Sequence, residues 1–544
     1  MAAAAFLGGL CGASPALAQP AEGTAASRCT ALAGESLSGL EIVSAQLTAA
    51  GAMPRASAGN GPPALILLRH CLVQGVINRR VGAGGRAFGI KFELRMPTEW
   101  NGRFLFQGGA GLDGVVASAT GTIPNSAQAP ALVRGFAVVT TDAGHSGSPV
   151  DASFATDQQA RVDYGYNAID KVTLAAKSLM ARFYGRAPQY SYFIGCSNGG
   201  RQALTASQRL PLYFDGIVAG DPTIRFSRVA LDEIWNLRVL ARIAPQDGLG
   251  RPIYSRAISD ANLKLVHDAV LKRCDAKDGL ADGMINDWQA CDFDPAVLAC
   301  KRGAAANCLA AGQVQALRDL HSGPRTRDGK ALYGRFNYDT GISSAAWRGM
   351  RLGTSDTGAA NAADATLGLG GFRYFQLTPP DPGFDPAAGL NLDQLLERIG
   401  ATASIADADN PYLETFAGRG KMILYNGLSD QGLASSVLVD WYDRMLAATG
   451  PRARDSVRLF LIPGMLHCGG GEATDRFETL DAIMDWVERA KAPDRITASS
   501  SRGAALKRPL CPYPAVARYA GGDANLAESF VCSPSGSWPA PHQS

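Results

Sequence analysis

Short apolar runs alternate with amphipathic helical stretches in the first part of the chain. Apolar runs that predict strands occupy residues 91–97, 103–107, 136–142, 190–195 and 215–222. Residues 166–184, between the third and fourth runs, carry apolar side chains at helical spacing, and a helix-compatible stretch follows the fourth run. This order of strands and helices predicts a parallel sheet with helices packed on its faces.

The alternation stops near residue 222 and resumes near residue 421. The intervening residues have helical patterns, four cysteines, Gly/Asp turns and a proline-rich stretch, with few strand-like runs. Strands are predicted again at 421–427 and 457–464, and helices at 435–449 and 476–491. We therefore expect an α/β fold built from residues 19–222 and 411–544, with a largely helical domain inserted at residues 223–410.

The charge and the N-terminus restrict the possible partners and location. The net charge is +3 over 544 residues and no Lys/Arg-rich run occurs, so neither nucleic acid nor an anionic membrane is an expected partner. Residues 1–18 are apolar and end in Ala16-Leu17-Ala18, which is typical of a cleaved signal peptide, although no basic residue precedes the apolar run. The alternative is a plain alanine-rich N-terminus. We expect a secreted or periplasmic protein with no transmembrane helix.

The cysteine count supports an oxidising location. Removing Cys11 with the signal peptide leaves ten cysteines, an even number that suits five disulfides, and the absence of a C-x-x-C pair disfavours a zinc site. Sequence spacing suggests four local pairs and leaves the distant residues Cys196 and Cys468. The four local pairs are Cys29–Cys71, Cys274–Cys291, Cys300–Cys308 and Cys511–Cys532.

A candidate nucleophile follows the predicted strand at 190–195. The segment Gly195-Cys196-Ser197-Asn198-Gly199 matches G-x-S-x-G between a strand and a helix, which is the context this motif requires. Glycines on both sides permit a sharp turn, and the turn presents the serine at the carboxyl edge of the sheet. The alternative is an ordinary serine in a glycine-rich turn.

The order of residues in α/β-hydrolases, Ser then acid then His, selects the partners of Ser197. His467 directly follows the predicted strand at 457–464, whereas His267 and His321 lie in the inserted region and His542 lies in the tail. Asp430 follows the strand at 421–427 and is the expected acid. Asp440 and Asp443 are alternatives, but they lie in a predicted helix and are better explained as solvated charges.

The expected roles of the catalytic residues follow from the general mechanism of serine hydrolases. His467 would take the proton of Ser197 and Asp430 would orient the imidazole. The N–H of Asn198 would form one half of the oxyanion hole, and the glycine-rich loop at residues 107–114, with Gly109 as the candidate, the other half. The pair Asp142 and His145 precedes the serine and is expected to be structural.

The two unpaired cysteines flank this candidate triad. Cys196 precedes Ser197 and Cys468 follows His467, so a formed triad would bring the two thiols together. The leftover cysteines and the triad order therefore predict the same contact, a Cys196–Cys468 disulfide.

The chain resembles the tannase and feruloyl esterase family, which includes bacterial mono(2-hydroxyethyl) terephthalate hydrolase. The resemblance runs from about Trp100-Asn101-Gly102 to the tail and is most specific at Cys196-Ser197, Asp430 and His467-Cys468. It implies an α/β-hydrolase fold with a lid inserted between the Ser and Asp strands, which fits residues 223–410. It also implies a small aromatic ester as substrate: a galloyl, feruloyl or other hydroxycinnamoyl ester, or a terephthalate half-ester.

The resemblance also implies Ca²⁺ bound in the lid. The segment CDAKDGLADGMIND carries closely spaced carboxylates, which suit calcium. The implied ligands are the side chains of Asp275, Asp278 and Asp282 and the carbonyls of Leu280 and Met284. The alternative is an Asp/Gly turn without an ion.

The lid residues that would set substrate specificity do not stand out. Three arginines are possible carboxylate anchors but suit ordinary ion pairs better, and three aromatic residues suit the lid core better than a substrate slot; they are Arg348, Arg351, Arg373, Trp347, Phe372 and Phe375. Two other functions stay open from the residues alone, a serine peptidase or amidase and a non-catalytic secreted protein that binds calcium or glycan. The oligomeric state is not predicted.

Overall fold

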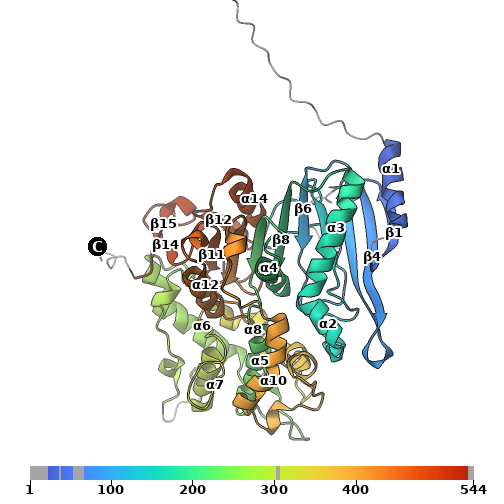
Figure 1. Cartoon of the computed structure of the whole chain (residues 1–544). Coiled ribbons are helices and arrows are strands. Elements are labelled where there is room, and N and C mark those ends of the chain that lie inside the picture. Colours follow the sequence, from blue (N-terminus) through green and yellow to red (C-terminus); the bar gives the residue numbers. More distant parts are fainter. Residues whose placement is uncertain (1–21, 36–37, 53–65, 302–306, 537–544) are drawn as a thin grey trace, which may run out of the picture.

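The structure is a computed structural model that describes residues 22–35, 38–52, 66–301 and 307–536 (Figure 1). The predicted signal peptide at residues 1–18, Cys11 and His542 lie outside the described residues. No helix within the described ranges is long and apolar enough to cross a membrane.

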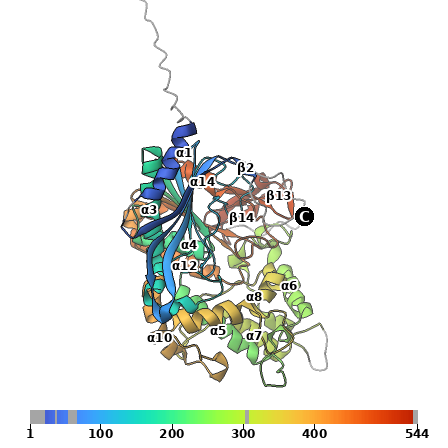
Figure 2. The same ribbon diagram turned by 90° about the vertical axis from the view of Figure 1, so that its right-hand side faces the viewer.

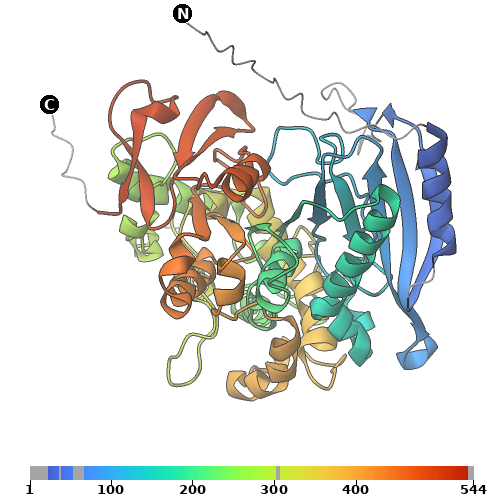
Figure 3. The same cartoon turned by 45° about the horizontal axis from the view of Figure 1, so that its top comes forward.

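A nine-stranded sheet forms the centre of the molecule, in the order β1-β4-β5-β7-β6-β8-β9-β10-β11 (Figures 1 and 3). The six strands from β7 to β11 run parallel, whereas β1, β4 and β5 extend the sheet through antiparallel pairing. The strand bounds are β1 Leu40–Thr48, β4 His70–Val81, β5 Ala87–Pro97, β6 Arg103–Gln107, β7 Ala137–Thr141, β8 Tyr190–Cys196, β9 Gly216–Gly220, β10 Lys421–Gly427 and β11 Val457–Ile462. A short ladder joins β2 (Gly51–Ala52) and β3 (Ile66–Leu67).

Helices cover both faces of the sheet, as the sequence pattern predicts. One apolar core packs the strands against helices whose bounds are α1 Glu22–Ala31, α3 Ala168–Tyr184, α4 Asn198–Arg209 and α12 Ser435–Thr449. A second core lies on the opposite face, where α14 (Thr479–Arg489) and the tail pack against β8 to β11. The parallel strands are therefore buried on both faces, which explains why they read as continuous apolar runs.

The chain between β9 and β10 is helical, and no strand occurs in its described residues, 221–301 and 307–420. Its helices form apolar cores of their own, and in Figures 1 and 2 they lie beyond one end of the sheet. We call residues 223–410 the insert. Its helices are α5 Phe226–Ala241, α6 Asp260–Cys274, α7 Ala311–Ser322, α8 Ala345–Arg351, α9 Leu369–Gly371 and α10 Leu392–Ala406. Short helices also occur outside it, at α2 Gln158–Val162, α11 Glu414–Ala417 and α13 Pro451–Arg454.

The C-terminal region forms two hairpins that sequence analysis did not predict. They consist of β12 (Ile496–Ser500) with β13 (Gly503–Leu510), and β14 (Ala515–Tyr519) with β15 (Phe530–Pro534). Arg508 on β13 pairs with Asp282 of the insert, and Arg518 on β14 pairs with Asp287. Because both arginines are almost fully buried, these ion pairs fix the tail against the insert.

Five disulfides join the cysteines of the described residues, in the pairing that sequence analysis predicts. The four local bridges join Cys29 to Cys71, Cys274 to Cys291, Cys300 to Cys308 and Cys511 to Cys532. The fifth joins Cys196 to Cys468, which are 272 residues apart in the chain.

Candidate active site

Ser197 lies on a sharp turn between β8 and α4. Its backbone has φ 63° and ψ −123°, a conformation that costs a non-glycine residue of order 1–3 kcal/mol. The glycines of the motif are required sterically: a Cβ on Gly195 would lie 2.5 Å from backbone atoms of Gly199, and one on Gly199 would lie 2.7 Å from the carbonyl oxygen of Gly109. The turn is therefore closely packed on every side except that of the serine hydroxyl, which faces a cavity.

Asp430 and His467, which follow strands β10 and β11, form a hydrogen-bonded pair. Asp430 follows β10, and its Oδ2 lies 2.7 Å from His467 Nδ1. The other carboxylate oxygen accepts hydrogen bonds from the backbone N–H groups of Gly432 (2.8 Å) and Leu433 (2.9 Å). These bonds hold the carboxylate of a fully buried side chain, so the imidazole is fixed from behind.

The pair also controls the charge of the imidazole. Burial disfavours a charged imidazole, but the negative charge and the hydrogen bond of Asp430 outweigh it and raise the pKa of His467 to about 9. Burial likewise opposes the ionised form of Asp430, yet the charge of His467 keeps the pKa of Asp430 below its usual value. The arrangement therefore stabilises an imidazolium next to a carboxylate.

A second buried acid, Asp221, lies beside this pair and was not predicted from the sequence. One oxygen of each of Asp221 and Asp430 and one ring nitrogen of His467 all lie within 4.8 Å of one another. The Asp221 carboxyl accepts hydrogen bonds from the N–H groups of Gly427 (2.8 Å) and Cys468 (3.3 Å). Burial, followed by the charge of Asp430, raises the pKa of Asp221 well above its usual value, which favours a neutral carboxyl. The only sequence signal for it is an Asp-Pro pair directly after β9.

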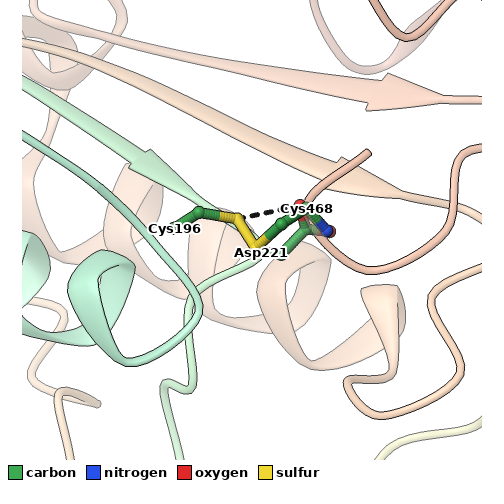
Figure 4. A group of neighbouring side chains, drawn as sticks. All are labelled: Cys196, Asp221 and Cys468. Carbon is green, nitrogen blue, oxygen red and sulfur yellow. Dashed lines mark hydrogen bonds between the residues drawn. A yellow bond between two sulfur atoms is a disulfide. The ribbon is translucent and has the colours of Figure 1, made fainter. Parts of the chain in front are cut away.

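The Cys196–Cys468 disulfide fixes the serine turn to the histidine loop. Its two Cα atoms are 6.0 Å apart, and Figure 4 shows the bridge between the end of β8 and the loop after β11, next to Asp221. Oδ2 of Asp221 lies 3.5 Å from Cys196 Sγ. The acid thus contacts both the disulfide and the backbone that carries His467.

The two expected donors of the oxyanion hole, the N–H groups of Asn198 and Gly109, have different surroundings. Asn198 is the first residue of α4, where a backbone N–H has no partner within the helix. Its side chain accepts hydrogen bonds from Tyr164 Oη (3.0 Å) and Arg201 Nε (2.8 Å), which fix its position. The Gly109 N–H donates to Gln202 Oε1 at 2.9 Å, so an oxyanion would have to displace that bond. Gly109 therefore stays a prediction, and its neighbour Gly111 lines the cavity beside Ser197.

A cavity of about 160 Å³, open to solvent, has Ser197 and His467 in its wall. Its lining is largely apolar and comes from both the sheet and the insert. The insert contributes Phe226, Val229, Ala230, Glu233, Met350, Leu367, Gly371 and Gln376. The cavity can therefore hold an apolar group of a substrate against the serine hydroxyl.

Four alternative candidates contact other parts of the protein and lie outside the cavity wall: Asp142, His145, Asp440 and Asp443. His145 is buried and stacks on Phe154, with ring centroids 3.5 Å apart, and Asp142 accepts hydrogen bonds from the N–H groups of Lys91 and Gly144. Asp440 pairs with Arg225 and Arg444, and Asp443 accepts a hydrogen bond from a tyrosine of the tail. These four residues do not line the cavity.

None of the three arginines considered as carboxylate anchors lines the cavity. Arg348 pairs with Asp260, Arg351 with Asp364, and Arg373 donates to the carbonyl of Phe384. Trp347, Phe372 and Phe375 are buried in apolar cores, as expected.

The aspartate loop of the insert contains carboxylates, which suit calcium, but they are hydrogen-bonded to the protein and do not converge on one point. Asp278 is buried, and its carboxylate accepts hydrogen bonds from the N–H of Leu280 and from the backbone and side chain of Asn286. The carboxylate of Asp275 accepts hydrogen bonds from the N–H groups of Asp282 and Gly283. Asp282 pairs with Arg508. Among the described residues, oxygens of the three carboxylates do not all approach within 4.8 Å of one another. An ion would have to draw them together.

The turn at Ser197 and the acid–histidine pair behind it are typical of α/β-hydrolases. The chain matches the family described as tannase and feruloyl esterase over residues 71–533. It is 40% identical over 525 residues to mono(2-hydroxyethyl) terephthalate hydrolase of Piscinibacter sakaiensis, covering 86% of each chain. It is 29% identical over 464 residues to a probable feruloyl esterase of Arthroderma benhamiae, covering 81% of each.

A solved structure has the same fold. Feruloyl esterase B from Aspergillus oryzae superposes with a TM-score of 0.78 at 24% identity, over 94% of this chain and 100% of that one. The protein therefore belongs to the tannase and feruloyl esterase family and is a carboxylic ester hydrolase. This assignment replaces the peptidase and the non-catalytic alternatives.

Proposed function

We propose that Ser197, Asp430 and His467 form a catalytic triad that hydrolyses esters of aromatic acids, feruloyl or other hydroxycinnamoyl and galloyl esters, through an acyl-enzyme on Ser197. The observation that carries the proposal is the shared cavity: Ser197 and His467 lie in one apolar wall, with His467 held from behind by buried Asp430. An aromatic acyl group could be buried there while its carbonyl meets the serine.

The proposed mechanism follows from this geometry. His467 takes the proton of the Ser197 hydroxyl as the oxygen attacks the ester carbonyl, and Asp430 stabilises the imidazolium that forms. The N–H of Asn198 donates to the oxyanion, together with a second N–H from the loop at residues 107–114. His467 then protonates the leaving alcohol, and water, activated by the same imidazole, releases the acid from Ser197.

The second candidate substrate is a terephthalate half-ester. It is favoured by the 40% identity to mono(2-hydroxyethyl) terephthalate hydrolase. A panel of purified protein with methyl ferulate, methyl gallate, mono(2-hydroxyethyl) terephthalate and p-nitrophenyl acetate separates the candidates. We expect the aromatic hydroxy-acid esters to have the highest kcat/KM. A protein that cleaves p-nitrophenyl acetate but no aromatic ester would contradict the proposed substrate class.

The raised pKa of His467 predicts an alkaline pH profile. The imidazole can act as a base only when it is unprotonated, and a pKa of about 9 keeps it protonated at neutral pH. Hence kcat/KM should rise about tenfold per pH unit from pH 7 towards pH 9 and then level off. Initial rates on methyl ferulate, corrected with the Ser197→Ala protein for spontaneous hydrolysis, measure this. A profile already flat above pH 7 would contradict it.

We also propose that the insert is a lid domain and that its aspartate loop binds Ca²⁺ through Asp275, Asp278 and Asp282 with the carbonyls of Leu280 and Met284. Support comes from the chemistry of the donor set. In addition, burial raises the pKa of Asp278 to about 7, and the charge of Asp282 adds to that rise; a cation would relieve both. The ion would be structural, since these residues do not line the cavity.

Calcium removal should lower the melting temperature. An ion bound only by the folded state stabilises it by mass action, so EDTA should lower the Tm of the wild type and metal analysis should find about one calcium per chain. Asp278→Ala should lower the Tm and abolish its response to EDTA, while the exposed control Asp268→Ala should leave both unchanged. A metal-free protein whose Tm ignores calcium would rule the site out.

We further propose export to an oxidising compartment. Five disulfides form and persist in such compartments and are rare in the cytosol. The signal-like residues 1–18 support the same location, which is secreted or periplasmic.

A further inference from the structure

One face of helix α5 forms a continuous wall of the catalytic cavity. Phe226, Val229, Ala230 and Glu233 all line it, at positions i, i+3, i+4 and i+7. This spacing places them on one stripe that is two turns, or about 10.5 Å, long. Phe226 is at the end of the stripe near the serine turn, since its ring packs against Tyr164, whose hydroxyl bonds to Asn198. Glu233 therefore lies at the end away from Ser197.

Two polar groups at this cavity lack the partners that buried polar groups usually have. Glu233 is only 6% exposed, and no hydrogen bond to its carboxyl occurs among the described residues. Gln376 is fully buried; its Nε2 donates to the carbonyl of Phe226, but its Oε1 has no hydrogen-bond partner in the described part of the chain. An unpaired buried polar atom such as Gln376 Oε1 is costly, and the Glu233 carboxyl in the wall of the same cavity has no protein partner among the described residues, so the two together point to a ligand that pairs with them.

The charges around Glu233 determine which ligand that is. Glu233, Asp232 and Asp364 are all buried, and Arg351 is the cation beside them, with Nη1 3.1 Å from Asp364 and Nη2 3.9 Å from Asp232. Burial, followed by the charge of Asp364, raises the pKa of Glu233 well above its usual value. A neutral carboxyl has one O–H to donate and a carbonyl oxygen to accept. No Lys or Arg is among the cavity-lining residues described here.

We infer that Glu233 and Gln376 select the acyl group: they bind an aromatic acyl group through an uncharged hydroxyl and disfavour a carboxylate in its place. A phenolic hydroxyl can donate to Gln376 Oε1 or to Glu233 and can accept from the Glu233 O–H. A carboxylate would lose its water, find no cation in the wall, and lie close to two further buried acids. This inference rests on the proposed function, since it assigns the wall of the same cavity to the acyl group.

Two matched substrate pairs test the inference. Methyl 4-hydroxycinnamate and methyl cinnamate differ by one hydroxyl, and mono(2-hydroxyethyl) terephthalate and 2-hydroxyethyl benzoate differ by one carboxylate. For the wild type we expect the hydroxyl to raise kcat/KM about tenfold, the usual worth of a buried hydrogen bond, and the carboxylate to lower it at least as much. Equal kcat/KM within the first pair, or a preference for the half-ester in the second, would overturn the inference.

Substitutions at Glu233 and Gln376 test whether these two residues cause the preference for the hydroxyl. Glu233→Leu should lower kcat/KM for methyl 4-hydroxycinnamate far more than for methyl cinnamate and so remove the hydroxyl preference, and Glu233→Gln, which keeps a donor and an acceptor, should restore most of that preference. Gln376→Leu is the second variant, needed if Glu233→Leu has no cooperative melting transition. A hydroxyl preference unchanged in every folded variant would overturn the assignment. Failure of the proposed function is distinct, because the wild type would then cleave none of the four esters.

Discussion

Replacing Ser197 by alanine should abolish the turnover of every ester that the wild type cleaves. The change removes the oxygen that becomes acylated, and deletion of a triad nucleophile costs on the order of 10⁴ to 10⁶ in kcat. The fold should persist, because the side chain of Ser197 makes no hydrogen bond within the described residues that a methyl group would break, and the strained backbone is held by the N–H of Ser197 to the carbonyl of Gly220. Steady-state rates on methyl ferulate and a thermal melt measure the two effects.

A serine on the same helix provides the control. Ser207 is buried on α4 and its hydroxyl donates only to the carbonyl of Leu204, so Ser207→Ala should keep its activity. If Ser197→Ala kept more than a few per cent of wild-type kcat, the nucleophile would be assigned wrongly.

Removing the Cys196–Cys468 disulfide should cost both stability and rate. The bridge closes a loop of 272 residues, for which chain entropy gives an upper figure of roughly 5 kcal/mol. The bridge also joins the residue before Ser197 to the residue after His467, and a misplacement of about 1 Å between a nucleophile and its base costs on the order of 100-fold in rate. The double variant Cys196→Ala/Cys468→Ala should therefore lose more activity than folded protein, measured as kcat per active site and as Tm.

The Cys511–Cys532 bridge is the matched control, since it lies in the tail hairpin and away from the cavity. Its removal should lower the Tm and leave kcat of the folded fraction within a few-fold. Peptide mapping without reduction should also find one linked pair that contains Ser197 and His467. Free thiols at both positions would contradict the bridge and weaken the assignment of His467.

The central strands could be predicted from the sequence, whereas the edges could not. Strands β6 and β10 and helix α12 have the bounds that the apolar pattern predicts, because buried parallel strands are continuous apolar runs. The edge strands β1 and β4 and the four tail strands were missed. Strand β1 largely alternates between half-buried and exposed residues, a pattern that a search for apolar runs does not detect.

The residues of the candidate site were likewise predicted only in part. Ser197, Asp430 and His467 were predictable because each follows a strand, and strand ends meet at one edge of the sheet. Asp221 also follows a strand, but it was missed because the order Ser, acid, His needs one acid and Asp430 fills that place. Glu233 was missed because nothing in the sequence of its helix indicates a place in a cavity wall. The partner of the Gly109 N–H, Gln202, likewise depends on how α4 packs against the loop.

Two arginines of the tail are synthesised after the insert but form ion pairs with aspartates in it. Arg508 and Arg518 hold Asp282 and Asp287, which are made more than 200 residues earlier. Until those arginines leave the ribosome, the two carboxylates have no guanidinium beside them, and the loop that carries them cannot reach its final surroundings. A chain that stops short of Arg508 would contain every residue of the triad and yet leave the insert incomplete, so residues 508–518 belong to its folding unit rather than to a dispensable appendage.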